Sequence, residues 1–336
     1  MQDYASFIKE VESLGRISIR EAQEQTSKLL KSNVLDDDWG IDARLQAYSI
    51  LDLVCKYKQN GDADDFHNYA VTFSRINDYD AACIVLEHGL KRFPQNVDLL
   101  ADYLIYAPDS SSDDRYEKCD NHFQTLKQID MSLWTWRGFD FSIQYLISKL
   151  DQSVESIAAI CQELEEISNK YLELFVLDER SYFTTYLMQQ RLKLIAPKNK
   201  PEKNLENAVS LSINAPRCSL KLAEIMFDKK EYDKALQLLD KTIRDSIERS
   251  GGVPLANVYL LRFTIKASKL ISEMDSSKKI NVNDELTLKI NNAYLDYRIA
   301  KKLGNDSSKI NYAQQYVKII ETATGVFMDE DFDDIY

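Results

Sequence analysis

The sequence is poor in the residues that interrupt helices. Only nine glycines and six prolines occur among 336 residues, and the prolines lie where periodic apolar segments begin or end. A chain with so few breakers inside its periodic segments favours long helices over many short strands. No Asn-Gly turn joins two alternating apolar runs, so the sequence does not predict a β-hairpin architecture.

Long apolar runs and clustered basic residues are also scarce. No stretch approaches the length that spans a bilayer, and the N-terminus lacks the basic and apolar regions of a signal peptide. The chain has 42 Lys and Arg against 54 Asp and Glu, a net charge of −12. Phosphate contacts need clustered Lys and Arg, so this balance works against nucleic-acid binding. We therefore expect a cytoplasmic protein that binds neither membranes nor nucleic acid.

The sequence lacks the linear motifs of common enzymes. It has five cysteines without a CxxC pair and three histidines without HExxH or zinc-finger spacing. GxSxG, the P-loop and GxGxxG are absent as well. We predict no catalytic residue, no metal and no cofactor, and we expect the cysteines to be buried, reduced thiols. An enzyme on a helical scaffold stays an alternative, because a catalytic triad assembles in space rather than in sequence.

What the sequence has in abundance is helical periodicity. One apolar stripe is spaced as a single helix face, and it comprises Val154, Ile157, Ala158, Cys161, Leu164, Ile167 and Tyr171. Capping and stop signals agree with this period, for example Ser18 with Glu21 at a start and Asn60-Gly61 at an end. The pattern predicts about sixteen helices, including one over 131–149 and one over 216–228.

Two parts of the chain are similar to each other. Residues 77–82 read Asn-Asp-Tyr-Asp-Ala-Ala, and residues 230–235 read Lys-Glu-Tyr-Asp-Lys-Ala. Each segment begins the second helix of a predicted pair, and Ala70 and Ala223 lie at matching positions in the preceding helices. Repeats of this kind indicate stacked helical hairpins.

These residues resemble the tetratricopeptide repeat. The first unit matches its pattern at Phe66, Tyr69, Ala70, Phe73, Tyr79, Ala82, Leu86, Gly89 and Pro94. The second unit matches at Leu222, Ala223, Met226, Tyr232, Ala235, Leu239 and Thr242, with Ser219 at the first position and no closing proline. A degenerate third unit runs from Leu100 to Leu126. The resemblance implies an all-α fold, an α-solenoid in which hairpins stack into a right-handed superhelix with a concave groove.

The pattern divides the chain into three parts. Residues 1–59 are predicted to form N-terminal capping helices, residues 60–326 the array of tetratricopeptide-like hairpins, and residues 327–336 an acidic C-terminal tail. The resemblance implies that a protein or peptide partner binds in the groove. The net charge favours a neutral or basic partner, and the sequence leaves the oligomeric state open.

The resemblance also assigns groove-facing positions. They are Asp64, His67, Val71 and Ser74 in the first unit and Arg217, Leu220, Glu224 and Phe227 in the second. Family members that bind chaperone tails clamp a carboxylate with Lys, Asn and Arg at such positions. His67 and Val71 replace the Lys and Asn here, so we do not predict that ligand. The alternative interpretation is that these residues only contact adjacent helices.

Two further segments are candidate interfaces. Trp134 and Trp136 are two residues apart in the predicted helix 131–149 and should face different sides, one in the core and one available to a partner. The tail combines five acids with Phe332, Ile335 and Tyr336. It weakly resembles the acidic tip of bacterial single-stranded-DNA-binding proteins. It is a candidate for docking to a partner or for folding back on the groove, and the alternative is a solvated tail.

From these observations we predict a non-enzymatic scaffold for protein–protein interaction, acting as an adaptor or regulatory subunit. A peptide-sensing regulator of the helical-repeat type is the first alternative. Residues 1–59 show no helix-turn-helix with a basic recognition helix, which weighs against that reading.

Overall fold

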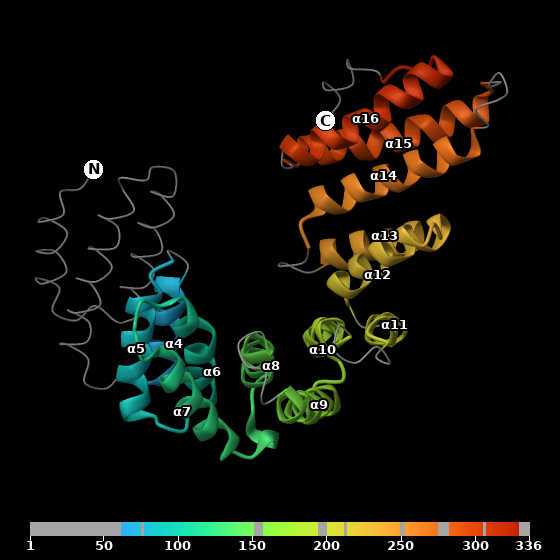
Figure 1. The fold of residues 1–336 in the computed structure, drawn as a ribbon. Coiled ribbons are helices and arrows are strands. Elements are labelled where there is room, and N and C mark those ends of the chain that lie inside the picture. Colours follow the sequence, from blue (N-terminus) through green and yellow to red (C-terminus); the bar gives the residue numbers. More distant parts are fainter. Residues whose placement is uncertain are drawn as a thin grey trace, which may run out of the picture. The chain divides into compact units, whose positions relative to one another are not determined.

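The computed structural model describes residues 62–74, 77–150, 157–193, 200–211, 214–248, 253–274, 282–304 and 307–328. All regular elements in these ranges are helices (Figure 1). The predicted capping helices of 1–59 and most of the predicted tail lie outside the described residues. The chain divides into two compact units, Met1–Val176 and Leu177–Tyr336.

Unit 1 is a stack of helical hairpins. Its described helices are α4 (Ala63–Ser74), α5 (Tyr79–Arg92), α6 (Val97–Tyr106), α7 (Arg115–Lys127), α8 (Trp136–Leu150) and α9 (Ile157–Leu174), with short 3₁₀ helices η1 (Ala107–Asp109) and η2 (Met131–Leu133). Consecutive helices pair as α4–α5, α6–α7 and α8–α9. The first helices of successive hairpins also pack together, α4 on α6 and α6 on α8.

Unit 2 repeats this arrangement. Its helices are α10 (Glu179–Leu192), α11 (Glu202–Ser210), α12 (Pro216–Asp228), α13 (Tyr232–Glu248), α14 (Leu255–Glu273), α15 (Asp284–Lys302) and α16 (Ser307–Thr324). They pair as α10–α11, α12–α13 and α14–α15, and α16 packs on α14 and α15. The prediction of an all-α fold of stacked tetratricopeptide-like hairpins, the α-solenoid class, is therefore confirmed. None of the described helices has the length and apolar character needed to cross a membrane.

The two similar segments form the same turn. Asn77 and Lys230 both have positive φ, 58° and 62°, a left-handed conformation that commonly ends a helix. The amide of the next residue donates to a carbonyl five residues earlier in each case, Asp78 to Phe73 at 3.0 Å and Glu231 to Met226 at 2.8 Å. This bonding reverses the chain at an equivalent place in the α4–α5 and α12–α13 hairpins.

The residues of the repeat pattern lie where the helices meet. Ala70 and Ala82 are fully buried in α4 and α5, as are Ala223 and Ala235 in α12 and α13. Without a bulky side chain, these positions let the two helices of a hairpin approach closely. The larger apolar residues of the pattern are buried beside them, and they are Phe73, Leu86, Leu222, Met226 and Leu239. The pattern thus encodes packing between helices.

Gly89 lies at one close approach between helices. A Cβ atom added there would lie 2.9 Å from Cβ of Phe66 and 3.0 Å from Cδ1 of Leu99. We expect Gly89→Ala to lower the free energy of unfolding by about 1–2 kcal/mol, because overpacking outweighs a gain of about 1 kcal/mol in helix propensity. Urea unfolding followed by circular dichroism measures this. The exposed neighbour His88 provides a control, since His88→Ala should change the free energy of unfolding by less than about 0.5 kcal/mol. A Gly89→Ala variant that is more stable than the original protein would contradict the packing argument.

The prediction of one helix over 131–149 is wrong. Residues 131–133 form η2, Trp134 has extended backbone with φ −72° and ψ 138°, and α8 begins only at Trp136. The indole Nε1–H of Trp134 donates to the carbonyl of Ile129 at 3.1 Å, and its side chain is 3% exposed. Tertiary packing of the indole therefore overrides the local helical pattern.

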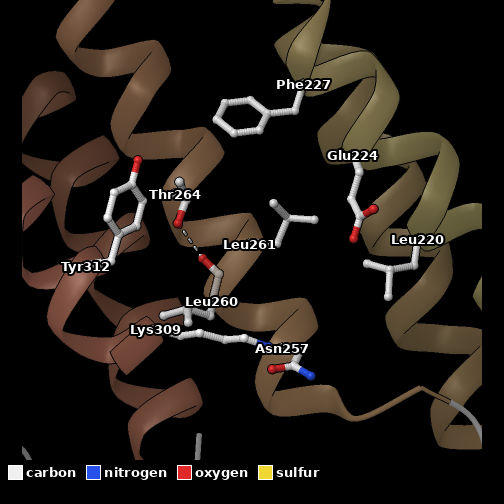
Figure 2. A pocket seen from close by; sticks show the side chains of 9 residues that line it. All are labelled: Leu220, Glu224, Phe227, Asn257, Leu260, Leu261, Thr264, Lys309 and Tyr312. Carbon is white, nitrogen blue, oxygen red and sulfur yellow. Dashed lines mark hydrogen bonds between the residues drawn. The ribbon is translucent and has the colours of Figure 1, made fainter. Parts of the chain in front are cut away.

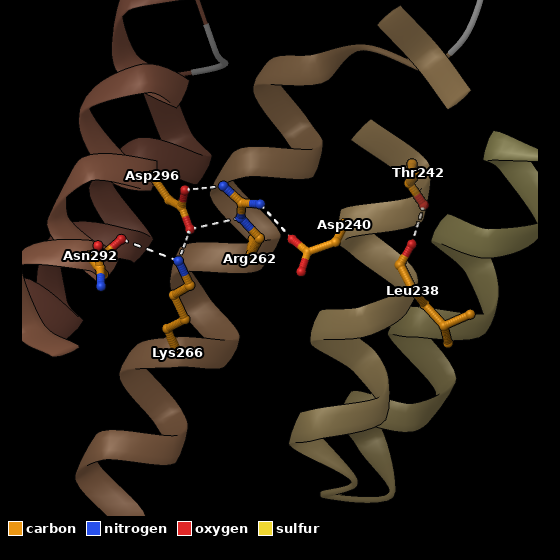
Figure 3. Close-up of polar contacts among 7 residues, drawn as sticks. All are labelled: Leu238, Asp240, Thr242, Arg262, Lys266, Asn292 and Asp296. Carbon is orange, nitrogen blue, oxygen red and sulfur yellow. Dashed lines mark hydrogen bonds and ion pairs between the residues drawn. The ribbon is translucent and has the colours of Figure 1, made fainter. Parts of the chain in front are cut away.

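An ion-pair network centred on the buried Asp296 joins three helices of unit 2 (Figure 3). Asp296 of α15 is 1% exposed and accepts two hydrogen bonds from Arg262 of α14, at 2.9 and 2.6 Å. Lys266 lies 2.8 Å from the same carboxylate. Arg262 also bonds Asp240 of α13 at 2.6 Å. The bidentate geometry fixes the rotation of α14 relative to α15, and it therefore sets which side chains α14 presents on its other face.

Candidate functional site

Three helices of unit 2 line an open pocket. It has a volume of about 500 Å³ and lies between α12, α14 and α16 (Figure 2). Its lining residues are Leu220, Glu224 and Phe227 of α12, Asn257, Leu260, Leu261 and Thr264 of α14, and Lys309 and Tyr312 of α16. A volume in this range suits one or two large side chains of a ligand.

The pocket lining is mainly apolar with a few polar groups. Phe227 and Leu261 point into the space between α12 and α14 (Figure 2), and Tyr312 is 57% exposed. Glu224 pairs with Lys221 on its own helix at 2.7 Å. The Thr264 hydroxyl donates to the carbonyl of Leu260 at 2.9 Å, so its donor is already used. A mainly apolar lining in which Glu224 and Thr264 are already paired favours binding of an apolar side chain over catalysis of a reaction.

The N-terminus of α12, which carries three of the nine lining residues, is contacted by a residue of another hairpin. Ala215 occupies the N-cap position of α12 and provides no side-chain cap. The Glu179 carboxylate of α10 replaces that cap and accepts the amide N–H of Cys218 at 2.8 Å. Glu179 is 8% exposed, so its charge acts on the positive end of α12 with little screening. The placement of Leu220, Glu224 and Phe227 therefore depends on α10.

The structure brings together three of the four positions that the second repeat unit assigned. Leu220, Glu224 and Phe227 line the pocket, whereas Arg217 is exposed and is not among its lining residues. The contributions of α14 and α16 were missed, and they are Asn257, Leu260, Leu261, Thr264, Lys309 and Tyr312. These helices lack the repeat signature, so no groove-facing position was assigned to them.

The four positions assigned in unit 1 lie on α4. Asp64 is exposed in the first turn, and Val71 and Ser74 are half-buried. His67 forms a hydrogen bond and ion pair through Nδ1 with Asp102 of α6, whose side chain is 1% exposed. Burial raises the pKa of Asp102 above its usual value, and the hydrogen bond from His67 opposes that shift. His67 therefore connects adjacent first helices, which agrees with the alternative interpretation of this position.

The remaining candidate interface residues are the two tryptophans and three residues of the C-terminal tail. Trp136 is half-buried at the start of α8, where Arg137 lies 4.8 Å from its ring centroid. Trp134 belongs to the core. Phe332, Ile335 and Tyr336 lie outside the described residues.

Cys83, Cys119 and Cys218 are buried free thiols, whereas Cys161 is half-buried, so the expectation of buried cysteines is wrong at that position. Burial raises the pKa of Cys83 and of Cys119 to about 12, and it raises the pKa of Cys218 further. Thiols in that state are poor nucleophiles near neutral pH. Cys55 lies outside the described residues. Within the described ranges, no three His, Cys, Asp or Glu side chains gather closely enough to hold a metal ion.

Several solved helical-repeat structures are similar to this chain, at low sequence identity. No family model matches the sequence, and no curated protein matches it either. A tetratricopeptide repeat protein from Parabacteroides merdae is 16% identical with a TM-score of 0.43, over 87% of this chain and 98% of that one. The thermophilic TPR protein TTC0263 of Thermus thermophilus is 15% identical with a TM-score of 0.42, over 60% and 98%. Yeast Tom70 is 15% identical with a TM-score of 0.45, over 92% of this chain and 61% of that one.

The hairpins, their buried small residues and their shared turn define the class. The chain is a helical-repeat protein with a tetratricopeptide-like fold. Its described pocket lies between α12, α14 and α16 in unit 2.

Proposed function

We propose that this protein is a non-enzymatic interaction scaffold, an adaptor or regulatory subunit, that binds a segment of a partner polypeptide on the face formed by α12, α14 and α16. The observation that carries the proposal is the pocket of about 500 Å³, lined by residues of α12, α14 and α16. Apolar side chains on its floor provide affinity, and Glu224, Asn257 and Lys309 at its edges provide orientation. The net charge of −12 supports an overall neutral or basic partner. A cytoplasmic location stays a prediction from the sequence.

The test is selection of binding segments followed by substitution in the pocket. We expect a displayed library of random 16-residue peptides to yield clones that bind the full chain. Leu261→Asp should weaken those clones at least about tenfold, because it puts a charge against the apolar floor. Affinities are measured by fluorescence anisotropy, after thermal unfolding has shown that the variant is folded.

Leu288 of α15 provides the matched control. It is 62% exposed and is not among the pocket's lining residues, so Leu288→Asp should leave peptide binding unchanged. Clones that bind the Leu261→Asp and Leu288→Asp variants equally well, or a library that yields no Leu261-dependent clone, would refute the proposed site.

A further inference from the structure

The last described helix has apolar side chains on two adjoining faces. Ala313, Val317 and Ile320 of α16 are buried against α14 and α15. Tyr312 is 57% exposed and Ile319 is 49% exposed, with the half-buried Tyr316 between them. These three residues follow the i, i+4, i+7 spacing of one helix face. We call this set, Tyr312, Tyr316 and Ile319, the α16 stripe.

The α16 stripe is exposed among the described residues. Within the described residues of unit 2, α10, α12 and α14 each pair with a following helix, whereas no described helix follows α16. A helical hairpin cannot bury its apolar surface alone. A row of exposed apolar side chains on α16 therefore indicates an interaction surface.

The stripe and the pocket form one continuous surface. Tyr312 is the first residue of the stripe and also lines the pocket. The Tyr312 and Tyr316 rings contact each other edge to face, with centroids 5.8 Å apart. The stripe extends along α16 by about 10 Å, two helical turns. An element that lies along this face and also reaches the pocket must be straight and apolar on one side, which describes an amphipathic helix in a groove.

The charges at the pocket indicate which polar group such a helix carries. Lys309 is exposed, lines the pocket and lies about one turn before Tyr312. Among the described residues no carboxylate pairs with it. Across the pocket, Glu224 already has Lys221 as its partner. The uncompensated charge at this end is therefore positive, and it attracts a carboxylate.

We infer that the partner segment is an amphipathic helix that packs its apolar face on the α16 stripe, inserts a large side chain into the pocket and places a carboxylate against Lys309. This inference rests on the proposed function and deepens it. One carboxylate is compatible with a partner that is neutral overall. The net negative charge of the chain thus disfavours strongly acidic partners at long range. Within the site, Lys309 favours a segment with a carboxylate at the matching position.

The experiment uses three synthetic 18-residue peptides and the full chain. The first peptide is helical and neutral overall, with a leucine stripe and one flanking Glu. The second replaces that Glu with Lys, and the third has the first peptide's composition with a central Pro. We expect the Glu peptide to bind at least about fivefold more tightly than the Lys peptide, and Lys309→Glu to reverse that order. Tyr316→Ser and Ile319→Ser should each weaken the Glu peptide about tenfold, and the Pro peptide should bind weakly. Equal affinity of the Glu and Lys peptides, or no effect of Ile319→Ser, overturns the inference.

Further outcomes separate this inference from the proposed function. If peptide binding depends on Leu261 but not on Ile319 or on the helical conformation of the peptide, the inference is overturned. The proposed function then remains supported. If removal of residues 329–336 strengthens the Glu peptide about tenfold or more, the chain's own acidic segment occupies the surface, which overturns the assignment to a partner. If sedimentation shows a dimer that Ile319→Ser converts to a monomer, the occupant is a second copy, and the inference is again overturned.

Discussion

Asp296→Ala is expected to lower the free energy of unfolding of unit 2 by about 3–5 kcal/mol, because it breaks a buried ion pair by removing one partner. The carboxylate is 1% exposed and accepts both hydrogen bonds of the Arg262 fork. Alanine would leave Arg262, which is 19% exposed, and Lys266, which is 26% exposed, without their buried counter-charge. Urea unfolding followed by circular dichroism measures the loss. Hydrogen exchange in peptides from α14 and α15 locates it.

The same arginine provides the control. Asp240 also pairs with Arg262, at 2.6 Å, but its side chain is 60% exposed. Solvent screens that pair, so Asp240→Ala should cost less than about 1 kcal/mol. Asp296→Asn keeps an acceptor oxygen of the same shape and should cost less than Asp296→Ala. If the two alanine variants lose equal stability, burial is not what makes the Asp296 pair important.

The sequence contains an indication of this ion-pair network, the position of Asp296 on an otherwise apolar helix face. Asp296 lies in register with Ala293, Tyr297 and Ala300 on the buried face of α15. An acid among apolar residues at helical spacing indicates a buried carboxylate, and such a group needs a cation. The identity of that cation could not be predicted, because Arg262 is 34 residues earlier in the chain. Its proximity arises only when α14 packs on α15.

The helices themselves were predictable because their signals are local. Pro216 at the first position of α12 and the lysines that follow its last residue agree with observed bounds of Pro216–Asp228, the same as the predicted 216–228. The pocket was predictable at only three of its nine lining residues, for a related reason. The repeat signature assigned the face of α12, whereas Leu261 and Tyr312 come from helices without the signature. The N-terminal cap of α12 was not predictable at all, since Glu179 supplies it from a different hairpin.

The second large effect is expected in unit 1, at Phe139 of α8. This side chain is fully buried and is the centre of an aromatic cluster. It stacks on Tyr171 of α9 with centroids 5.0 Å apart and rings 5° from parallel, and it contacts Phe175 at 5.9 Å and Trp134 at 5.2 Å. Phe139→Ala should cost about 3–5 kcal/mol, the usual range for removing a buried phenylalanine. Denaturant unfolding followed by tryptophan fluorescence measures it, since all three tryptophans precede residue 177.

Phe141 on the same helix gives a matched comparison. It is half-buried and contacts the ring of Trp136 edge to face, at 6.1 Å, so Phe141→Ala should cost clearly less than Phe139→Ala. The native emission should also distinguish the two variants. Trp134 leaves the helical path to pack on Phe139, so a cavity at residue 139 should let water reach the indole and shift its emission to longer wavelength. If Phe139→Ala loses stability without that shift, the hydrogen bond from Trp134 to Ile129 suffices to hold the indole. The extended backbone at Trp134, between η2 and α8, would then depend on that hydrogen bond and not on the aromatic cluster.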